Sequence, residues 1–129
     1  MIEIEDLYKS FNHRDVLNGV SLNVQRGEIL AVIGGSGVGK SVLLKHITGL
    51  IRPDRGTIKV DGQEVTNLRG KLLVSYRERI GFLFQGGALF DSMTVFENAA
   101  FPLREKTKLP EKKVKRRYFG LKRYLSCDQ

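Results

Sequence analysis

Residues 34–41 combine the residue types and spacing that hold phosphate groups. They read Gly-Gly-Ser-Gly-Val-Gly-Lys-Ser, which fits the pattern G-x-x-x-x-G-K-S/T, and they directly follow the apolar run 29–33. A strand that ends at this loop and a helix that starts near Gly39 would leave backbone N–H groups in one concavity, at the positive end of the helix dipole. The pattern therefore predicts a triphosphate-binding loop, in which Lys40 reaches the β and γ phosphates and the Ser41 hydroxyl ligates Mg²⁺.

Glycines are needed in such a loop because a Cβ would block left-handed backbone conformations and the approach of phosphate oxygens. The alternative is a glycine-rich turn that precedes Lys-Ser by coincidence, which the strand-loop-helix context makes rare. The residues assigned to phosphate binding are Gly34, Gly35, Ser36, Gly37, Val38, Gly39, Lys40 and Ser41.

Composition limits the class of protein. The chain has 129 residues, which fits one domain, and its 41% hydrophobic and 28% charged residues are ordinary for a soluble globular protein. No apolar run approaches the length of a membrane span, and the acidic, alternating N-terminus is unlike a secretory signal. The single cysteine, Cys127, excludes an internal disulfide and suits a reducing compartment, so we expect the cytoplasm.

Positive charge is concentrated near the end of the chain. The net charge is +8, and residues 104–123 hold 10 Lys and Arg against 2 Asp and Glu, whereas residues 1–103 hold 12 against 11. A charge run of this kind is typical of a solvated helix face. The alternative is a surface that binds nucleic acid or anionic lipid, and such binding would fall steeply with salt.

Alternating and turn-forming residues predict an antiparallel layer. Period-two alternation indicates half-buried strands at 2–5 and 20–24, separated by a polar turn at 12–15. A third short strand is expected at 56–62, where Asp-Gly closes the run.

The remaining elements are predicted from apolar periodicity and capping residues. The continuously apolar runs 29–33 and 80–84 indicate strands covered on both faces in a parallel sheet. Residues 69–79 are basic and fit a helix or a loop. A helix over 39–50 would pack one face on the sheet, with Leu43, Ile47 and Leu50. Another helix is expected after Thr94, which forms a capping box with Glu97. The end of the chain follows helical spacing at Val114, Tyr118, Leu121 and Leu125.

In order and spacing, these features resemble the nucleotide-binding subunits of ABC transporters. Phe11 lies 29 residues before Lys40, where that family carries an aromatic that stacks on adenine. Gln85 lies 45 residues after Lys40, which suits the family's Q-loop. The resemblance implies that Phe11 and Val16 hold adenine and that Gln85 contacts Mg²⁺ and the attacking water. From the sequence alone, Phe11 also fits a core aromatic, Gln85 a surface glutamine, His13 a turn residue, and His46 a surface or packing residue.

The resemblance covers residues 2–104 and implies an α/β fold: a P-loop NTPase core with an antiparallel β layer, truncated relative to a whole ABC nucleotide-binding domain. Residues 1–104 would be the N-terminal part of that domain. Residues 105–129 would be a basic, helical tail that is truncated or out of frame relative to the family. ATP and Mg²⁺ are the implied cofactors, and two copies would close around two nucleotides on the inner face of the cell membrane. Another P-loop enzyme, such as a kinase, and a binding module that uses the basic tail are the rival functions.

A narrower resemblance lies in residues 84–98 and 101–105. They are similar to the ATPases that power phospholipid transport between Gram-negative membranes with mammalian-cell-entry partners. The resemblance implies that an apolar cluster docks the coupling helix of the membrane subunit, and local core packing is the alternative. The cluster is Ala88, Leu89, Phe90 and Met93.

The chain departs from the family after residue 104. No LSGGQ-like signature, no apolar strand ending in Asp-Glu and no switch histidine occur in the remaining sequence. The Asp supports Mg²⁺ and the Glu polarises the attacking water in the family. The chain as given is therefore expected to bind ATP or ADP and to hydrolyse ATP poorly or not at all, and nucleic acid is not an expected partner.

Overall fold

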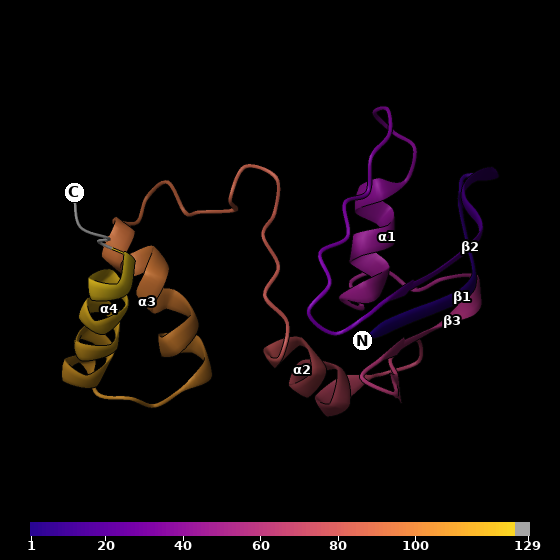
Figure 1. The fold of residues 1–129 in the computed structure, drawn as a ribbon. Helices are drawn as coiled ribbons and strands as arrows, with labels where there is room; N and C mark the ends of the chain where they lie inside the picture. Colours follow the sequence, from indigo (N-terminus) through magenta and orange to yellow (C-terminus); the bar gives the residue numbers. More distant parts are fainter. Residues whose placement is uncertain (126–129) are drawn as a thin grey trace. The chain divides into compact units, whose positions relative to one another are not determined.

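The computed structural model describes residues 1–125, and Cys127 lies outside the described residues. The chain divides into two compact units, residues 1–82 and 83–129 (Figure 1). The division at residue 104 that the family resemblance implies stays a prediction. The first unit contains β1 (Ile2–Phe11), β2 (Arg14–Val24), α1 (Lys40–Ile47), β3 (Arg55–Val60), β4 (Gln63–Glu64) and α2 (Gly70–Glu78). The second contains α3 (Val95–Lys106) and α4 (Glu111–Leu125).

The first unit is built on an antiparallel sheet with the strand order β2-β1-β3-β4. β1 and β2 form a long hairpin, which turns at Asn12 and His13 with φ angles of 48° and 62°. Two consecutive left-handed residues match the right-handed twist of the flanking strands. The predicted turn is therefore confirmed, His13 is a turn residue, and the antiparallel strands are longer than their alternation indicated.

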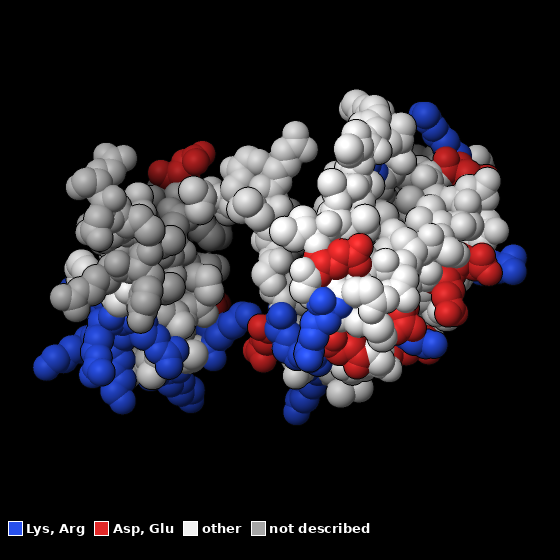
Figure 2. Space-filling view, in the orientation of Figure 1, with Lys and Arg blue, Asp and Glu red and all other residues white. Residues whose placement is uncertain are grey.

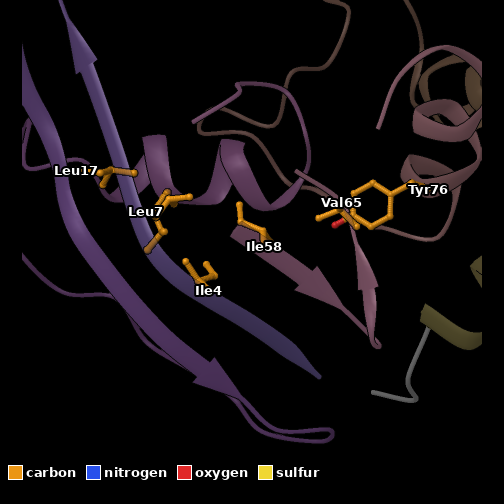
Figure 3. Close-up of a cluster of buried hydrophobic side chains, with 7 residues drawn as sticks. Ile4, Leu7, Leu17, Ile58, Val65 and Tyr76 are labelled. Carbon is orange, nitrogen blue, oxygen red and sulfur yellow. The ribbon is translucent and has the colours of Figure 1, made fainter. Parts of the chain in front are cut away.

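One face of the sheet carries the core of the first unit (Figure 3). Residues of β1, β2 and β3 point to this face, and an irregularity of β1 near Asp6 (φ 47°) lets Ile4 and Leu7 share it although they are three residues apart; Leu43 of α1 joins them, as expected. Each fully buried aliphatic side chain contributes about 1.5–3 kcal/mol relative to exposure. Leu50 does not join the core, because the chain turns at Gly49 and leaves this side chain exposed. The core residues are Ile4, Leu7, Leu17, Leu43, Ile58, Val65 and Tyr76.

Two predicted strands are not formed. Residues 29–33 and 80–84 belong to no strand. Ile29 and Ile33 are 96% and 92% exposed, so the first run is not covered on either face. A continuously apolar strand is stable only where neighbouring strands pair with it and other elements cover both faces. The described sheet supplies neither, and the prediction of buried strands at these two ranges was wrong for this chain.

The second unit is a pair of packed helices. Thr94 is the N-cap of α3: its Oγ1 accepts from the Glu97 N–H at 3.3 Å, while the Glu97 carboxylate accepts from the Thr94 N–H at 2.8 Å. The predicted capping box is confirmed. Ala100 of α3 and Val114 of α4 are fully buried, and the Phe96 and Tyr118 rings lie 5.0 Å apart in an edge-on contact. In the described part of the chain, no helix has the length and apolar composition to cross a membrane.

Candidate phosphate-binding site

The glycine-rich loop 34–41 has the backbone geometry that a phosphate cradle needs. Gly37 and Gly39 have φ angles of 77° and 96°, which confirms the expected left-handed conformations. Gly39 is the N-cap of α1, and within the described residues no side chain caps the helix. No acidic residue lies in the first turn of α1 either. The first N–H groups of this helix thus have no side-chain acceptor, and the positive end of its dipole faces the loop.

Lys40 is folded back over the loop. Its Nζ donates to the Gly34 carbonyl at 2.8 Å and to the Gly35 carbonyl at 2.5 Å. These bonds have an ionised donor but a neutral acceptor, whereas a phosphate oxygen also carries negative charge, so a phosphate attracts the Lys40 ammonium more strongly than the two carbonyls do. Ser41, the next residue, is exposed. The ammonium and the hydroxyl therefore stand at the start of α1, where the phosphate-loop pattern requires them.

Gly39 also brings the loop against the hairpin. A Cβ at this position would lie 2.8 Å from the Val16 carbonyl oxygen and 3.1 Å from Leu17 Cδ2. Only a residue without a side chain allows α1 to start this close to β2. The structure thereby places Val16, predicted to contact adenine, beside the end of the phosphate loop.

Phe11 lies in the same unit, at the end of β1. It pairs with Arg14 across the hairpin, and its side chain is 42% exposed. The Lys9 ammonium lies 5.3 Å from the ring centroid, which is within the range of a cation–π contact. Phe11 is therefore not the buried core aromatic that the sequence left open, and its ring is accessible for stacking.

α2 holds the carboxyl end of α1. The Tyr76 hydroxyl donates to the Ile47 carbonyl at 2.5 Å, and Arg77 Nη2 donates to the Gly49 carbonyl at 2.7 Å. A guanidinium satisfies the open carbonyls at this end and opposes the helix dipole. Burial raises the pKa of the Tyr76 hydroxyl. The sequence left 69–79 ambiguous, and no local pattern marks these two residues as partners of α1.

The segment that follows α1 is tied to β1 through Asp54. One carboxylate oxygen accepts from Lys9 Nζ at 2.6 Å and the other from the Ser10 N–H at 2.7 Å. The hydrogen bond from Lys9, and then that from the Ser10 backbone, lowers the pKa of Asp54 below its ordinary value. His46 is buried inside α1 and its Nδ1 lies 2.7 Å from the Val42 carbonyl oxygen. It is a packing residue.

The other predicted site residues lie in the second unit. Gln85 is exposed in the turn 85–88, and its role toward the phosphate loop stays a prediction. Leu89 is 68% exposed, which argues against local core packing of this side chain, whereas the Phe90 ring packs on Phe101 at 5.0 Å between centroids. A hollow of about 410 Å³ lies here, lined by Leu89, Phe90, Asp91, Met93, Val95, Asn98 and Ala99.

Asn98 of α3 shapes this hollow. Its Oδ1 accepts from the Phe90 N–H at 2.8 Å, and its Nδ2 donates to the Phe90 and Met93 carbonyls at 3.1 and 3.0 Å. Sequence reasoning did not single out Asn98. The sequence does contain one sign of this role: Asn98 directly follows Glu97 of the capping box. A short polar side chain at the start of a helix often forms hydrogen bonds with nearby backbone groups.

Comparisons with known proteins agree with this geometry. Residues 17–125 match the family model described as ABC transporter. The chain is 45% identical over 114 residues to the probable ribonucleotide transport ATP-binding protein mkl of Mycobacterium leprae (strain TN), covering 88% of this chain and 33% of that protein. It is 42% identical over 115 residues to the intermembrane phospholipid transport system ATP-binding protein MlaF of Haemophilus influenzae (strain ATCC 51907 / DSM 11121 / KW20 / Rd), covering 89% and 44%. The chain thus spans a third to under a half of the length of these relatives.

Solved structures show the same fold. A dimeric bacterial ABC transporter cassette superposes with a TM-score of 0.80 at 32% identity, over 95% of this chain and 56% of that chain. A cassette in a post-hydrolysis state bound to ADP and phosphate superposes with a TM-score of 0.79 at 31% identity, over the same shares of the two chains. The expected α/β fold class, a P-loop core with an antiparallel layer, is confirmed, although the strands at 29–33 and 80–84 are not formed.

Proposed function

The chain belongs to the ABC transporter family, and we propose that it is the ATP-binding part of a transporter ATPase that couples ATP hydrolysis to the movement of phospholipid. The observation that carries the proposal is the open loop 34–41, with Lys40 held over it and an uncapped helix behind it. The name of the MlaF relative, an intermembrane phospholipid transport protein, supports the choice of cargo.

The residues of the first unit suit a magnesium-nucleotide complex. Lys40 would exchange its two carbonyl acceptors for phosphate oxygens, and Ser41 would ligate Mg²⁺ with its hydroxyl. Phe11 would offer a ring face to adenine beside Val16, and stacking of this kind contributes about 1–3 kcal/mol, by analogy with base stacking on aromatics. Gln85 would contact Mg²⁺ and the attacking water. When bound, Mg²⁺ would supply electrostatic stabilisation of the phosphate charges.

The hollow beside Leu89 suits a helix of a membrane subunit. It is lined mainly by apolar groups, and Asn98 holds its loop in one conformation. An amphipathic helix binds such a groove through its apolar face. By analogy with the dimeric cassette that it resembles, the proposed transporter would contain two copies of the ATPase, each docked on a membrane subunit at the inner face of the membrane.

Calorimetric titration with Mg-ATP and Mg-ADP tests the nucleotide proposal. Lys40→Ala removes a charge-assisted contact to phosphate, so its affinity should fall by about 1.5–3 kcal/mol. Lys45→Ala is the matched control, because it removes a lysine from the same helix outside the loop. Equal affinities of wild type and Lys40→Ala would contradict the proposal, as would an equal loss in both variants.

A further inference from the structure

The outer face of α4 carries a dense group of cations. On the opposite face, Val114 is fully buried and Tyr118 packs edge-on against Phe96 of α3, which fixes the orientation of the helix. Figure 2 shows Lys and Arg side chains gathered on the second unit. Within residues 111–120 of α4, the exposed cations are Lys112, Lys113, Lys115, Arg116 and Arg117.

Within residues 1–120, most of these cations have no carboxylate partner; Lys115 interacts electrostatically with Glu111, one turn before it. Glu111 is held by Arg104, with Nη2 and Oε1 2.7 Å apart. Among residues 1–120, no carboxylate lies within 4 Å of the charged groups of Lys113, Arg116 or Arg117. A solvated helix is stabilised when opposite charges alternate at i and i+4, whereas Lys113 and Arg117 are like charges at this spacing. Glu111 and Lys115 form a favourable pair at this spacing, whereas the repulsion between Lys113 and Arg117 lowers the stability of the helix, and a bound anion would relieve that repulsion.

The cations surround a hollow that can receive an anionic group. Lys113, Arg116 and Arg117 line it together with Leu109, and its volume is about 340 Å³. A guanidinium presents several N–H donors in a fixed plane and binds phosphate at two points. Two arginines and a lysine around one hollow thus match the chemistry of a phosphate group.

An aromatic side chain lies on the same outer face. Phe119 is 60% exposed, three residues after Arg116 and four after Lys115, so helical spacing puts it beside them. Its only aromatic contact among the described residues is an edge contact with Tyr118, 5.4 Å between centroids. A large apolar side chain among cations is typical of a helix that lies in a membrane interface, where the cations contact headgroups and the ring enters the acyl boundary.

We propose that the basic face of α4 binds anionic phospholipid at a membrane surface; it is made of Lys112, Lys113, Lys115, Arg116 and Arg117, with Phe119 beside Lys115 and Arg116. The hollow on one side of Arg116 receives a headgroup phosphate, and Phe119, on the other side of Arg116, enters the boundary below the headgroups. The choice of a lipid surface over RNA rests on the proposed function, in which the protein is located at the inner face of a membrane. The site itself lies in the second unit and does not involve the loop 34–41.

Sedimentation of the full 129-residue chain with large vesicles tests the proposal. We expect binding to vesicles of phosphatidylcholine and phosphatidylglycerol, little binding to phosphatidylcholine alone, and a steep fall with added salt. A variant with Lys113, Arg116 and Arg117 all changed to Gln should bind the anionic vesicles about 100-fold more weakly. The matched control changes three exposed cations of the first unit to Gln and should bind like wild type. The control residues are Arg52, Arg69 and Lys71.

Phe119→Ser separates insertion from charge attraction. It should lower binding to anionic vesicles several-fold and leave the salt dependence unchanged, because it removes apolar area and no charge. An equal loss in both triple variants would overturn the proposal, since net charge alone would then explain binding. Equal binding to both lipid mixtures would overturn it as well.

A parallel titration with single-stranded RNA shows whether α4 prefers RNA or an anionic phospholipid surface. Tighter binding to RNA than to anionic vesicles, lost in the α4 triple variant, would replace the lipid proposal. Mg-ATP calorimetry on the same variants tests nucleotide binding at the loop 34–41 separately from lipid binding at α4. The α4 variants should retain the wild-type nucleotide affinity, and a wild type that binds vesicles but no nucleotide would contradict only the nucleotide function.

Discussion

Replacing Gly39 with alanine should destabilise the first unit more than the same change at another left-handed glycine. At φ 96°, any L side chain is strained, which costs roughly 1–2 kcal/mol. The new Cβ would also lie 2.8 Å from the backbone oxygen of Val16, so α1 and β2 must separate. Overpacking of this kind costs typically about 1–3 kcal/mol. The expected total loss is therefore about 2–5 kcal/mol, a large part of a normal domain's stability.

Gly62→Ala is the control, because it introduces the backbone strain of a left-handed alanine without a steric clash. Gly62 has a φ of 76°, and no heavy atom lies within 4 Å of the position that an alanine methyl would occupy there. Both glycines lie in the first unit, so urea denaturation followed by circular dichroism compares the same transition. Gly39→Ala should unfold at clearly lower urea than Gly62→Ala. If the two variants lose the same stability, the close approach of loop and hairpin does not hold α1 in place.

Four further outcomes follow from the structure. The hydrogen bond from Lys9 lowers the pKa of Asp54 in the folded chain below the ordinary value of 3.8. The ionised Asp54 carboxylate therefore stabilises the fold above pH 3.8, and this stabilisation is lost as the pH falls below that value. Asp54→Asn should therefore flatten the acid side of a plot of melting temperature against pH, and an unchanged curve would contradict this. Thr94→Ala should destabilise the second unit by about 1 kcal/mol in urea, through loss of the capping box. Under the proposed function, Leu89→Asp in a longer protein that contains this chain should abolish copurification with the proposed membrane subunit and keep nucleotide affinity within a few-fold; a large fall in melting temperature with lost ATP binding would instead show a core residue. The 129-residue chain alone should turn over ATP near the uncatalysed rate, and robust turnover that disappears in Ser41→Ala would refute this.

Local features of this protein could be predicted from its sequence because each depends on residues close together in the chain. Gly37 and Gly39 supply the left-handed backbone that the loop 34–41 requires, and Thr94 can cap only the helix that starts next to it. The turn at Asn12 and His13 follows from polar residues between two alternating runs. The concentration of positive charge after residue 104 is a property of composition.

Tertiary structure decided the features that join distant segments. Nothing near Gly39 in sequence shows that it faces the Val16 carbonyl, and nothing near Arg77 shows that it bonds the end of α1. The apolar run 29–33 has the composition of a buried strand, yet it is exposed, because burial depends on neighbours that a local pattern does not contain. The same holds for Phe119, whose exposure follows from the packing of Val114 on α3. The sequence determines which chemical groups are present. Packing between segments far apart along the chain determines which of these groups contact one another and which are exposed to solvent.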